Sequence, residues 1–217
     1  MIKRVNTIKV VGAGTAGLVT ALILKQKYKE NLDIEIIKSD KVGIIGVGEG
    51  STEHFADFLE FIGIDKTEII KECGATFKFG INFKEWGSYN YLHNVDDSQN
   101  LKNAGHFVYY NKLIAENKPV VYDYILQNKY PAQHIEKPYV NQFHFDTYKL
   151  NDYLQRLCVE RDIKITDDEI VKVELDKDNG NIKLVKSEKN YYTADFFIDC
   201  TGFKRLLINE LCGEWDS

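Results

Sequence analysis

A glycine-rich segment, GAGTAG at residues 12–17, lies between a short apolar run and a longer apolar-rich stretch near the start of the sequence. The run Thr7 to Val11 predicts a buried strand, and the stretch that extends to about Tyr28 predicts a helix. A second apolar run, Leu32 to Ile37, predicts another strand. Strand, glycine turn, helix and strand in this order form a βαβ unit, which predicts an α/β fold built on a parallel sheet.

The glycine spacing matches the G-x-G-x-x-G pattern of turns that bind dinucleotides. Gly12 permits a tight turn, Gly14 lets the backbone approach a pyrophosphate, and Gly17 lets the helix pack closely on the strand. The phosphates then lie at the N-terminus of the helix. The alternative is a glycine turn without a ligand. On the first interpretation, the cofactor-binding residues of this segment are Gly12, Gly14, Thr15, Ala16 and Gly17.

The end of the second strand is unusual for a dinucleotide site. An acidic residue normally lies there and binds the hydroxyls of the adenosine ribose, whereas this sequence has Lys38. Either Ser39 or Asp40 replaces the missing acid from the next positions, or Lys38 is a solvated strand end and the ribose is held less well. The residue types alone leave both interpretations open.

A second informative segment, FFIDCTGF at residues 196–203, lies far downstream of the glycine turn. An apolar strand from Phe196 to Asp199 is followed by Cys-Thr-Gly, where the backbone can approach a cofactor. We therefore expect Thr201 and Gly202 to bind the cofactor. Flavoprotein monooxygenases carry two such segments, and a simple NAD dehydrogenase has no need of the second. The pair of segments therefore favours FAD over NAD.

Apolar and polar residues alternate between Cys73 and Phe83, which predicts a half-buried strand. Its two sides carry, respectively, Ala75, Phe77, Phe79, Ile81 and Phe83, and Thr76, Lys78, Gly80 and Asn82. The polar side either faces bulk water or lines a cavity in which the lysine ammonium has a role. Strand periodicity does not decide between these alternatives.

The remaining segments divide into ordered and irregular parts. The apolar spacing after Thr52 predicts an amphipathic helix that ends at Gly63. Periodicity is poor from Ser88 to Asn141, where polar residues and tyrosines are frequent, and we interpret this segment as an irregular insertion. After it, Asp146 is a plausible N-cap of a helix. That helix precedes a β-meander with a hairpin turn at Asn179-Gly180.

Composition and charge exclude several classes of function. The 217 residues carry a net charge of −5, so the chain has no electrostatic attraction for nucleic acid or an anionic membrane. Its four cysteines and five histidines lack the spacing of a zinc site or a disulfide framework, so we expect no metal. No apolar run approaches the ~20 residues of a membrane span, and no signal peptide is visible. We expect a soluble, cytoplasmic protein with reduced cysteines.

Several segments occur in the order seen in flavin-dependent tryptophan halogenases, and the chain resembles that family over almost its whole length. The segments are GAGTAG, GVGEGST with FLEFIGI after it, ATFKFGINFKEW, FHFD with YLQRL after it, and FIDCTGFKRLLI. The resemblance implies a Rossmann-like FAD-binding fold of the FAD-dependent monooxygenase type, with a β-meander and an irregular inserted substrate region. It divides the chain into residues 1–87, the first part of the FAD-binding domain with the catalytic-lysine strand; residues 88–141, the substrate-side insertion; and residues 142–217, the return to the FAD-binding domain.

The resemblance also implies individual site residues. The lysine of the ATFK segment is catalytic in this family and falls on Lys78, which on the residues alone would be a solvated strand lysine. Glu49 belongs to a segment that resembles the strap beside the flavin. Val171 resembles the position that covers the adenine through its main chain, and the alternative for Val171 is a core strand residue.

The reaction implied by the resemblance uses reduced FAD from a separate flavin reductase, O2 and a halide, either chloride or bromide, to form hypohalous acid. Lys78 relays this oxidant to an indole-like or tryptophan-like aromatic substrate. An ammonium polarises hypohalous acid by hydrogen bonding, whereas a neutral amine forms a haloamine, and partial burial makes both states of a lysine accessible.

The sequence departs from the family at its C-terminal side. In the family, a W-x-W-x-I-P segment, the carboxylate paired with the lysine and the halide-binding turn all lie downstream of Ser217, and here Trp86 and Trp215 stand alone. The chain is then a truncated fragment, or a partner chain supplies the remainder, or halogenation has been lost. The competing functions are an FAD-dependent aromatic monooxygenase that hydroxylates its substrate and a non-catalytic remnant of an FAD-binding fold.

Overall fold

The computed structural model of the chain describes residues 4–46, 48–78, 80–85, 91–94, 116 and 142–212. Up to residue 94 its elements are β1 (Thr7–Val11), α1 (Thr15–Tyr28), the 3₁₀ turn η1 (Lys29–Asn31), β2 (Asp33–Lys38), β3 (Gly48–Gly50), α2 (Glu53–Phe61), α3 (Lys66–Cys73), β4 (Thr76–Phe77), β5 (Gly80–Phe83) and β6 (Tyr91–Asn94). From residue 143 they are β7 (Phe143–Asp146), α7 (Thr147–Glu160), β8 (Lys164–Asp167), β9 (Ile170–Leu175), β10 (Ile182–Ser187), β11 (Tyr191–Tyr192), β12 (Phe196–Asp199), the 3₁₀ turn η3 (Gly202–Lys204) and α8 (Ile208–Cys212).

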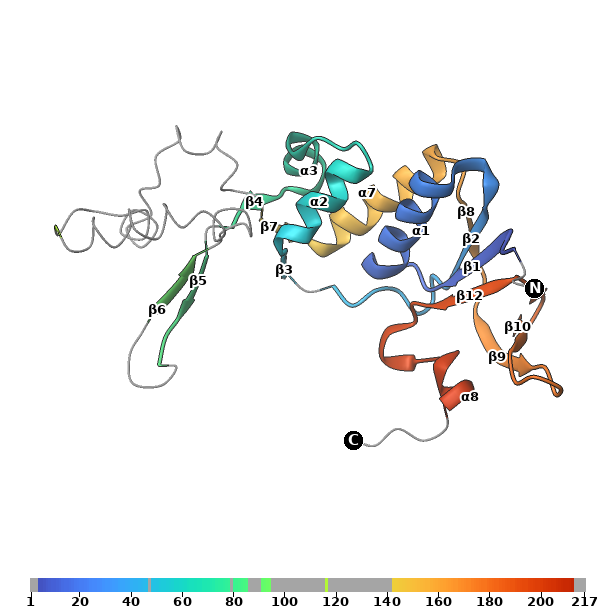
Figure 1. Cartoon of the computed structure of the whole chain (residues 1–217). Helices are drawn as coiled ribbons and strands as arrows, with labels where there is room; N and C mark the ends of the chain where they lie inside the picture. Colours follow the sequence, from blue (N-terminus) through green and yellow to red (C-terminus); the bar gives the residue numbers. More distant parts are fainter. Residues whose placement is uncertain are drawn as a thin grey trace.

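A four-stranded sheet with the order β12-β1-β2-β8 lies at the centre of the α/β body (Figure 1). Each pair of neighbouring strands is parallel. The chain passes from β1 to β2 through α1, as the βαβ pattern predicts, and β12 adds to the free side of β1 although it lies far away in the sequence. The prediction of an α/β fold on a parallel sheet is confirmed.

Alternate residues of β1 and β2 belong to two apolar clusters. Val10 and Ile36 pack with residues of α1 and α7, whereas Val11 and Ile37 pack with residues of the β-meander. The meander is the antiparallel sheet β11-β10-β9, and Gly180, with a φ of +74°, lies in the turn between β9 and β10. The helices and the meander therefore cover opposite faces of the parallel sheet (Figure 1).

A second, antiparallel sheet has the order β3-β7-β4. On its inner face Phe143 and Phe145 are buried, and their rings contact those of Phe55 and Phe77. The outer face carries His144 of β7, which is exposed and lies opposite Thr76 of β4. The amphipathic alternation of FHFD thus places two aromatic rings in the core and leaves a polar outer face.

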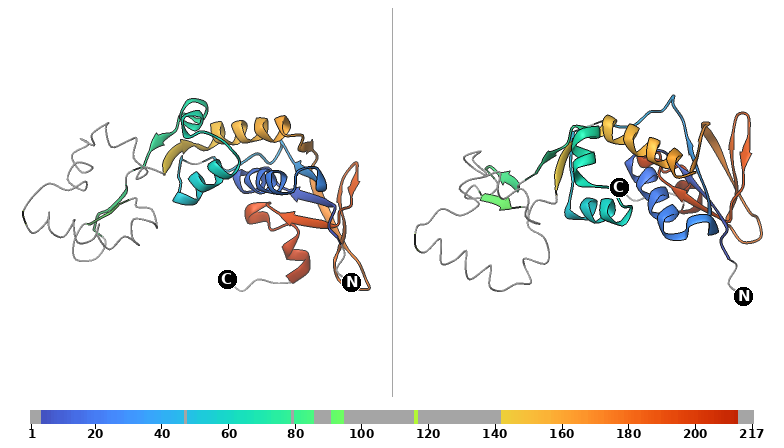
Figure 2. Two further views of the ribbon diagram at one scale, coloured as in Figure 1. Left: turned by 45° about the horizontal axis from the view of Figure 1, so that its top comes forward. Right: turned by 90° about the horizontal axis from the view of Figure 1, so that it is seen from above.

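The prediction of one continuous strand over residues 73–83 is wrong. β4 pairs with β7, whereas β5 pairs with β6 in a separate two-stranded sheet. Lys78 lies between β4 and β5, Phe79 is outside the described residues, and Ile81 on the expected apolar side is 44% exposed. β5 and β6 lie at the opposite end of the molecule from β9 and β10 (Figure 2). The single alternating pattern therefore belongs to two strands of different sheets.

The remaining expectations concern the insertion, the two tryptophans, membrane-spanning helices and metal sites. The insertion at residues 88–141, apart from β6 and residue 116, lies outside the described residues, as do Trp86 and Trp215. Within the described ranges, no helix has the length and apolar character needed to cross a membrane. The same residues contain no group of three or more His, Cys, Asp or Glu side chains that could hold a metal ion.

Glu35 of β2 is a buried charge that links β2 to its two neighbouring strands, β1 and β8, through side-chain hydrogen bonds. Its carboxylate accepts hydrogen bonds from Lys164 (2.8 Å), Lys9 and the hydroxyl of Thr166 (2.6 Å). Burial acts to raise the pKa of Glu35, but these hydrogen bonds outweigh it and hold the pKa at about 2. The residue therefore remains ionised in the folded state at neutral pH.

Replacing Glu35 by glutamine should lower the free energy of unfolding at pH 7 by about 3 kcal/mol, because two lysines lose their buried partner. Since the folded-state pKa lies below the unfolded-state value, the stabilisation by the carboxylate is present above pH ~4.5 and is lost as the pH falls toward 2. Urea unfolding of the wild type and Glu35→Gln at pH 7 and pH 3 measures this difference in the free energy of unfolding. An equal difference at the two pH values would contradict the assignment.

Candidate functional site

A cavity of about 810 Å³ opens at the carboxyl-terminal edge of the parallel sheet. Its walls come from the glycine turn, the segments after β2 and β8, the chain before β3, the first turns of α7 and the loop after β12. Open α/β sheets bind ligands at this edge, and the volume lies within the range of small-molecule sites, about 300–1,000 Å³. The sequence-predicted residues that the cavity brings together are Gly12, Gly14, Thr15, Ala16, Ser39, Asp40, Glu49, Thr201 and Gly202.

The three glycines of the turn differ in what surrounds them. Gly12 has a φ of +108°, and a Cβ on it would lie 2.2 Å from the main-chain oxygen of Cys200. A Cβ on Gly17 would lie 2.0 Å from the main-chain oxygen of Gly12. Gly14 has a φ of −67°, and no described atom beyond Gly14 and its chain neighbours lies within 4 Å of its Cβ position. Packing within the protein thus requires Gly12 and Gly17, whereas the space beside Gly14 is open.

Helix α1 begins at this turn without a capping side chain. Its N-cap is Gly14, and no acidic residue lies in its first turn. The first N–H groups of a helix have no partner within the helix and carry partial positive charge. Because Thr15 and Ala16 line the cavity, this end of the cavity is suited to an anionic group such as a pyrophosphate.

Asn151 of α7 holds the glycine turn in place, a role that the sequence pattern did not predict. Its side chain is 3% exposed, and its amide donates a hydrogen bond to the main-chain oxygen of Ala13 (2.8 Å). The amide of Gln155 donates to the Asn151 side-chain oxygen (2.6 Å). The signal that would have found it is an asparagine on the apolar face of the predicted helix, because a buried amide needs a partner.

Replacing Asn151 by aspartate should lower the free energy of unfolding by about 1–3 kcal/mol, because a buried carboxylate cannot donate to the Ala13 oxygen. The change keeps the size of the side chain and the contact from Gln155. Urea unfolding at pH 7 measures the effect. The neighbouring Asp152 is exposed, so Asp152→Asn is the control and should change stability by less than about 0.5 kcal/mol. Equal stabilities of the two variants would show that the bond to Ala13 is unimportant.

Ser39 and Asp40 lie in the cavity wall directly after β2. The ammonium of Lys38 donates to the Asp40 carboxylate (2.7 Å) and holds the pKa of that group below its usual value. The Asp40 N–H donates to the carboxylate of Asp167 (2.9 Å). Lys38 is therefore an ion-paired residue and not simply a solvated strand end.

The loop after β12 is ordered by Asp199. One carboxylate oxygen accepts hydrogen bonds from the N–H (3.0 Å) and the hydroxyl (2.7 Å) of Thr201. The other accepts from the N–H groups of Leu207 (2.8 Å) and Ile208 (3.0 Å). Burial acts to raise the pKa of Asp199, but these bonds hold it below its usual value. Asp199 thus fixes the loop that presents Thr201 and Gly202 to the cavity.

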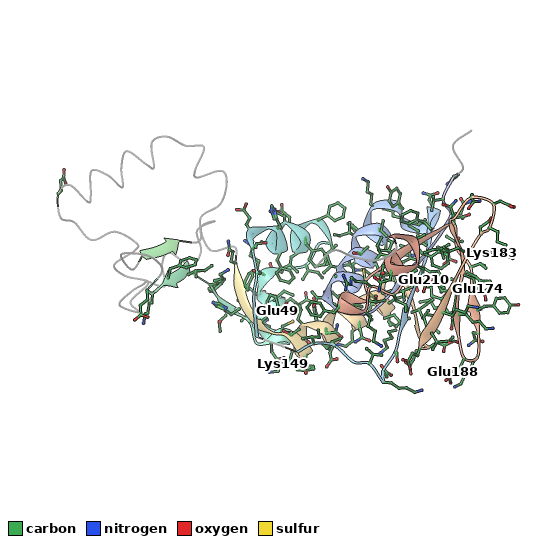
Figure 3. The ribbon with its side chains drawn as sticks, turned by 90° about the horizontal axis from the view of Figure 1, so that it is seen from below. Glu49, Lys149, Glu174, Lys183, Glu188 and Glu210 are labelled. Carbon is green, nitrogen blue, oxygen red and sulfur yellow. The ribbon has the colours of Figure 1, made fainter. Side chains whose placement is uncertain are left out.

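The strap, defined here as residues 44–46 and 48–51, borders the cavity through Ile44, Ile45 and Glu49. Glu49 lines the cavity and is labelled in Figure 3. Ser51 is 6% exposed; its hydroxyl accepts a hydrogen bond from the N–H of Phe143 (2.9 Å), and its own N–H donates to the Phe143 oxygen (2.7 Å). Two hydrogen bonds therefore fix the end of the strap to β7.

Lys78 lies beside the strap and is not among the residues that line the cavity. Its half-buried side chain reaches the main-chain oxygen of Ser51, to which the ammonium donates a hydrogen bond (2.9 Å). A Cβ on Gly50 would lie 3.5 Å from Cδ of Lys78 and 3.3 Å from Nδ1 of His144. The strap thus contacts the cavity through Glu49. Its next two residues, Gly50 and Ser51, contact Lys78.

Val171 is placed differently from the other predicted residues. It lies on β9 with 53% of its side chain exposed, so the alternative of a core strand residue is wrong. The cavity wall includes its neighbour Ile170 instead. A main-chain contact from Val171 to an adenine stays a prediction.

Comparisons with known proteins match this chain to tryptophan halogenases. A model described as tryptophan halogenase matches residues 7–217. The 7-chloro-L-tryptophan 6-halogenase KtzR of Kutzneria sp. (strain 744) is 29% identical, over 94% of this chain and 46% of its own length. The tryptophan 7-halogenase RebH of Lentzea aerocolonigenes is 27% identical, over 97% of this chain and 45% of its own length.

Solved structures agree with these relatives. The tryptophan 6-halogenase SttH from Streptomyces toxytricini superposes with a TM-score of 0.77 at 25% identity, covering 95% of this chain and 44% of that one. Xcc4156, a flavin-dependent halogenase from Xanthomonas campestris, gives a TM-score of 0.79 at 25% identity, covering 97% and 45%. The chain spans less than half the length of the relatives that it matches.

Proposed function

Because the chain belongs to the tryptophan halogenase family, we propose that it is the FAD-binding portion of a flavin-dependent halogenase acting on an indole or a similar electron-rich arene. Reduced FAD, supplied by a separate flavin reductase, provides the chemistry that converts O2 and chloride or bromide into hypohalous acid. In this proposal, residues 1–87 and 142–217 form the FAD-binding domain and residues 88–141 belong to the substrate side.

The fit between the cavity and FAD supports the proposal. The open space beside Gly14 and the uncapped N-terminus of α1 suit a pyrophosphate. Ser39, Asp40 and Ile170 line the cavity toward the meander, where the adenosine would lie, and Glu49 lines it on the strap. The cavity therefore extends to both sides of the glycine turn, as an elongated dinucleotide requires.

Lys78 is the residue that we assign to the relay of hypohalous acid. An ammonium has three N–H donors, and one of them is engaged by the Ser51 oxygen. The remaining donors can polarise hypohalous acid by hydrogen bonding. Gly50 has no side chain, and a Cβ there would lie only 3.3 Å from His144 and 3.5 Å from Lys78, so the strap approaches both side chains closely.

The observation that carries the proposal is the position of the strap between the cavity and Lys78. Glu49 lines the cavity, while Ser51, two residues later, binds the ammonium. In this proposal, oxidant made in the cavity passes the strap to reach Lys78. Such a separation suits a reaction in which the cofactor and the arene never touch, and hydroxylation by direct transfer from the flavin gives no reason for it.

A reductase-coupled assay tests the function. The protein is incubated with FAD, a flavin reductase, NADH, O2, tryptophan or indole, and chloride, bromide or no halide, and the products are analysed by mass spectrometry. A product with a halogen isotope pattern that appears only with halide supports the proposal. A hydroxylated product that forms regardless of halide identifies a monooxygenase, and FAD binding without any product shows that these 217 residues do not catalyse the reaction by themselves.

A further inference from the structure

The adenosine end of the cavity lacks the usual acid at the end of β2. Lys38 occupies that position, and its ammonium is paired with Asp40 at 2.7 Å. Asp40 is largely exposed, with 65% of its side chain accessible, and one of its oxygens is engaged by the lysine. The two residues therefore neutralise each other at the place where a free carboxylate is expected.

A second carboxylate lies at the same edge of the sheet. β8 is the parallel neighbour of β2, with Asp167 opposite Lys38. The next residue, Asp168, donates its main-chain N–H to the Lys38 oxygen (2.7 Å) and lines the cavity. Asp168 thus occupies the neighbouring strand end, at the level where the acid of β2 normally lies.

The carboxylate of Asp168 is held in a fixed orientation. One oxygen, Oδ2, accepts hydrogen bonds from Ser187 (2.7 Å), Asn190 (2.9 Å) and Tyr192 (2.6 Å), which all belong to the meander. The other oxygen, Oδ1, accepts no hydrogen bond from the described part of the chain. Partial burial acts to raise the pKa of Asp168, but the three donors hold it below its usual value. An ionised, oriented oxygen is therefore available in the cavity wall.

We infer that Oδ1 of Asp168 accepts a hydrogen bond from a hydroxyl of the adenosine ribose, in place of the missing acid at the end of β2. This inference rests on the proposed FAD site and assigns its ribose contact. Because the meander already orients the carboxylate, little ordering accompanies binding. Ser187, Asn190 and Tyr192 act as positioning residues for Asp168.

The contact between Asp168 and the ribose is tested by combining substitutions of Asp168 with removal of single ribose hydroxyls from the ligand. Binding of ADP, 2′-deoxy-ADP and 3′-deoxy-ADP is measured by calorimetry for the wild type, Asp168→Ala and Asp168→Asn. A hydrogen bond to an ionised carboxylate predicts that the wild type prefers ADP to one deoxy analogue by about tenfold. Asp168→Ala should bind ADP and that analogue equally. Asp33→Asn, which changes an exposed carboxylate at the opposite end of β2 and outside the cavity wall, should keep the preference.

The outcomes separate this inference from the function on which it rests. If the wild type binds FAD but does not distinguish ADP from either analogue, or if Asp168→Ala keeps the preference, the inference is wrong while the FAD site stands. If the wild type binds neither FAD nor ADP, both are wrong. Should both Asp168 variants unfold, a crystal structure of the wild type with ADP decides, according to whether a ribose hydroxyl lies within hydrogen-bond distance of Oδ1.

Discussion

On the proposed function, replacing Lys78 by alanine should lower the rate of halogenation by about 100-fold or more, because the group assigned to polarise the oxidant is removed. FAD affinity should be unchanged, since Lys78 does not line the cavity. The measurement is the reductase-coupled assay with bromide, together with a fluorescence titration of FAD. A loss of turnover with intact cofactor binding is the specific result expected for a relay residue.

Lys71→Ala is the matched control for that experiment. Lys71 is an exposed lysine in the last turn of α3, away from the strap and the cavity wall. Its replacement removes the same charge and should leave turnover unchanged. Equal rates for wild type and Lys78→Ala would contradict the role of Lys78, and loss of FAD binding in Lys78→Ala would show that the lysine acts through the structure of the strap.

The second large effect is expected at the glycine turn. Gly12→Ala should lower the free energy of unfolding by about 3 kcal/mol or more and abolish FAD binding. The added Cβ would lie 2.2 Å from the Cys200 oxygen, on a residue whose φ is +108°. Neither the turn nor the loop after β12 can move away without breaking the pairing of β1 with β12. Urea unfolding measures the change.

Gly180→Ala separates the clash from the backbone strain. Gly180 has a φ of +74° but no described atom beyond its chain neighbours within 4 Å of its Cβ position. Its replacement should cost only about 1 kcal/mol and leave FAD binding intact. If Gly12→Ala were no more destabilising than Gly180→Ala, the close contact between the glycine turn and Cys200 would not exist in solution.

Local patterns were sufficient to predict the elements that build the cavity. The glycine turn between β1 and α1, the hairpin at Asn179-Gly180 and Asp146 as the N-cap of α7 all depend on residues within a few positions of one another. Each pattern has a physical cause that the sequence displays directly, such as a turn that needs glycine or a helix start that needs an acceptor.

Contacts between distant segments were not predictable in the same way. Asn151 reaches Ala13 across 138 positions, and Asp168 lies beside Lys38 only because β8 adds to the edge of β2. The break between β4 and β5 has a similar origin, since pairing with β7 and with β6 selects different residues of one alternating segment. Periodicity indicates that a segment is a strand but does not indicate which strand it pairs with.

The most direct test of the cavity as an FAD site is a titration of FAD with the wild type and with Gly14→Ala, followed by quenching of flavin fluorescence. No described atom beyond its chain neighbours lies within 4 Å of a Cβ on Gly14, so this variant should unfold at the same urea concentration as the wild type. We expect saturable binding of micromolar affinity or better for the wild type and binding at least about tenfold weaker for Gly14→Ala, because the methyl group occupies the path of the pyrophosphate. No binding by the wild type, or equal binding by the two proteins, would contradict the assignment of the cavity to FAD.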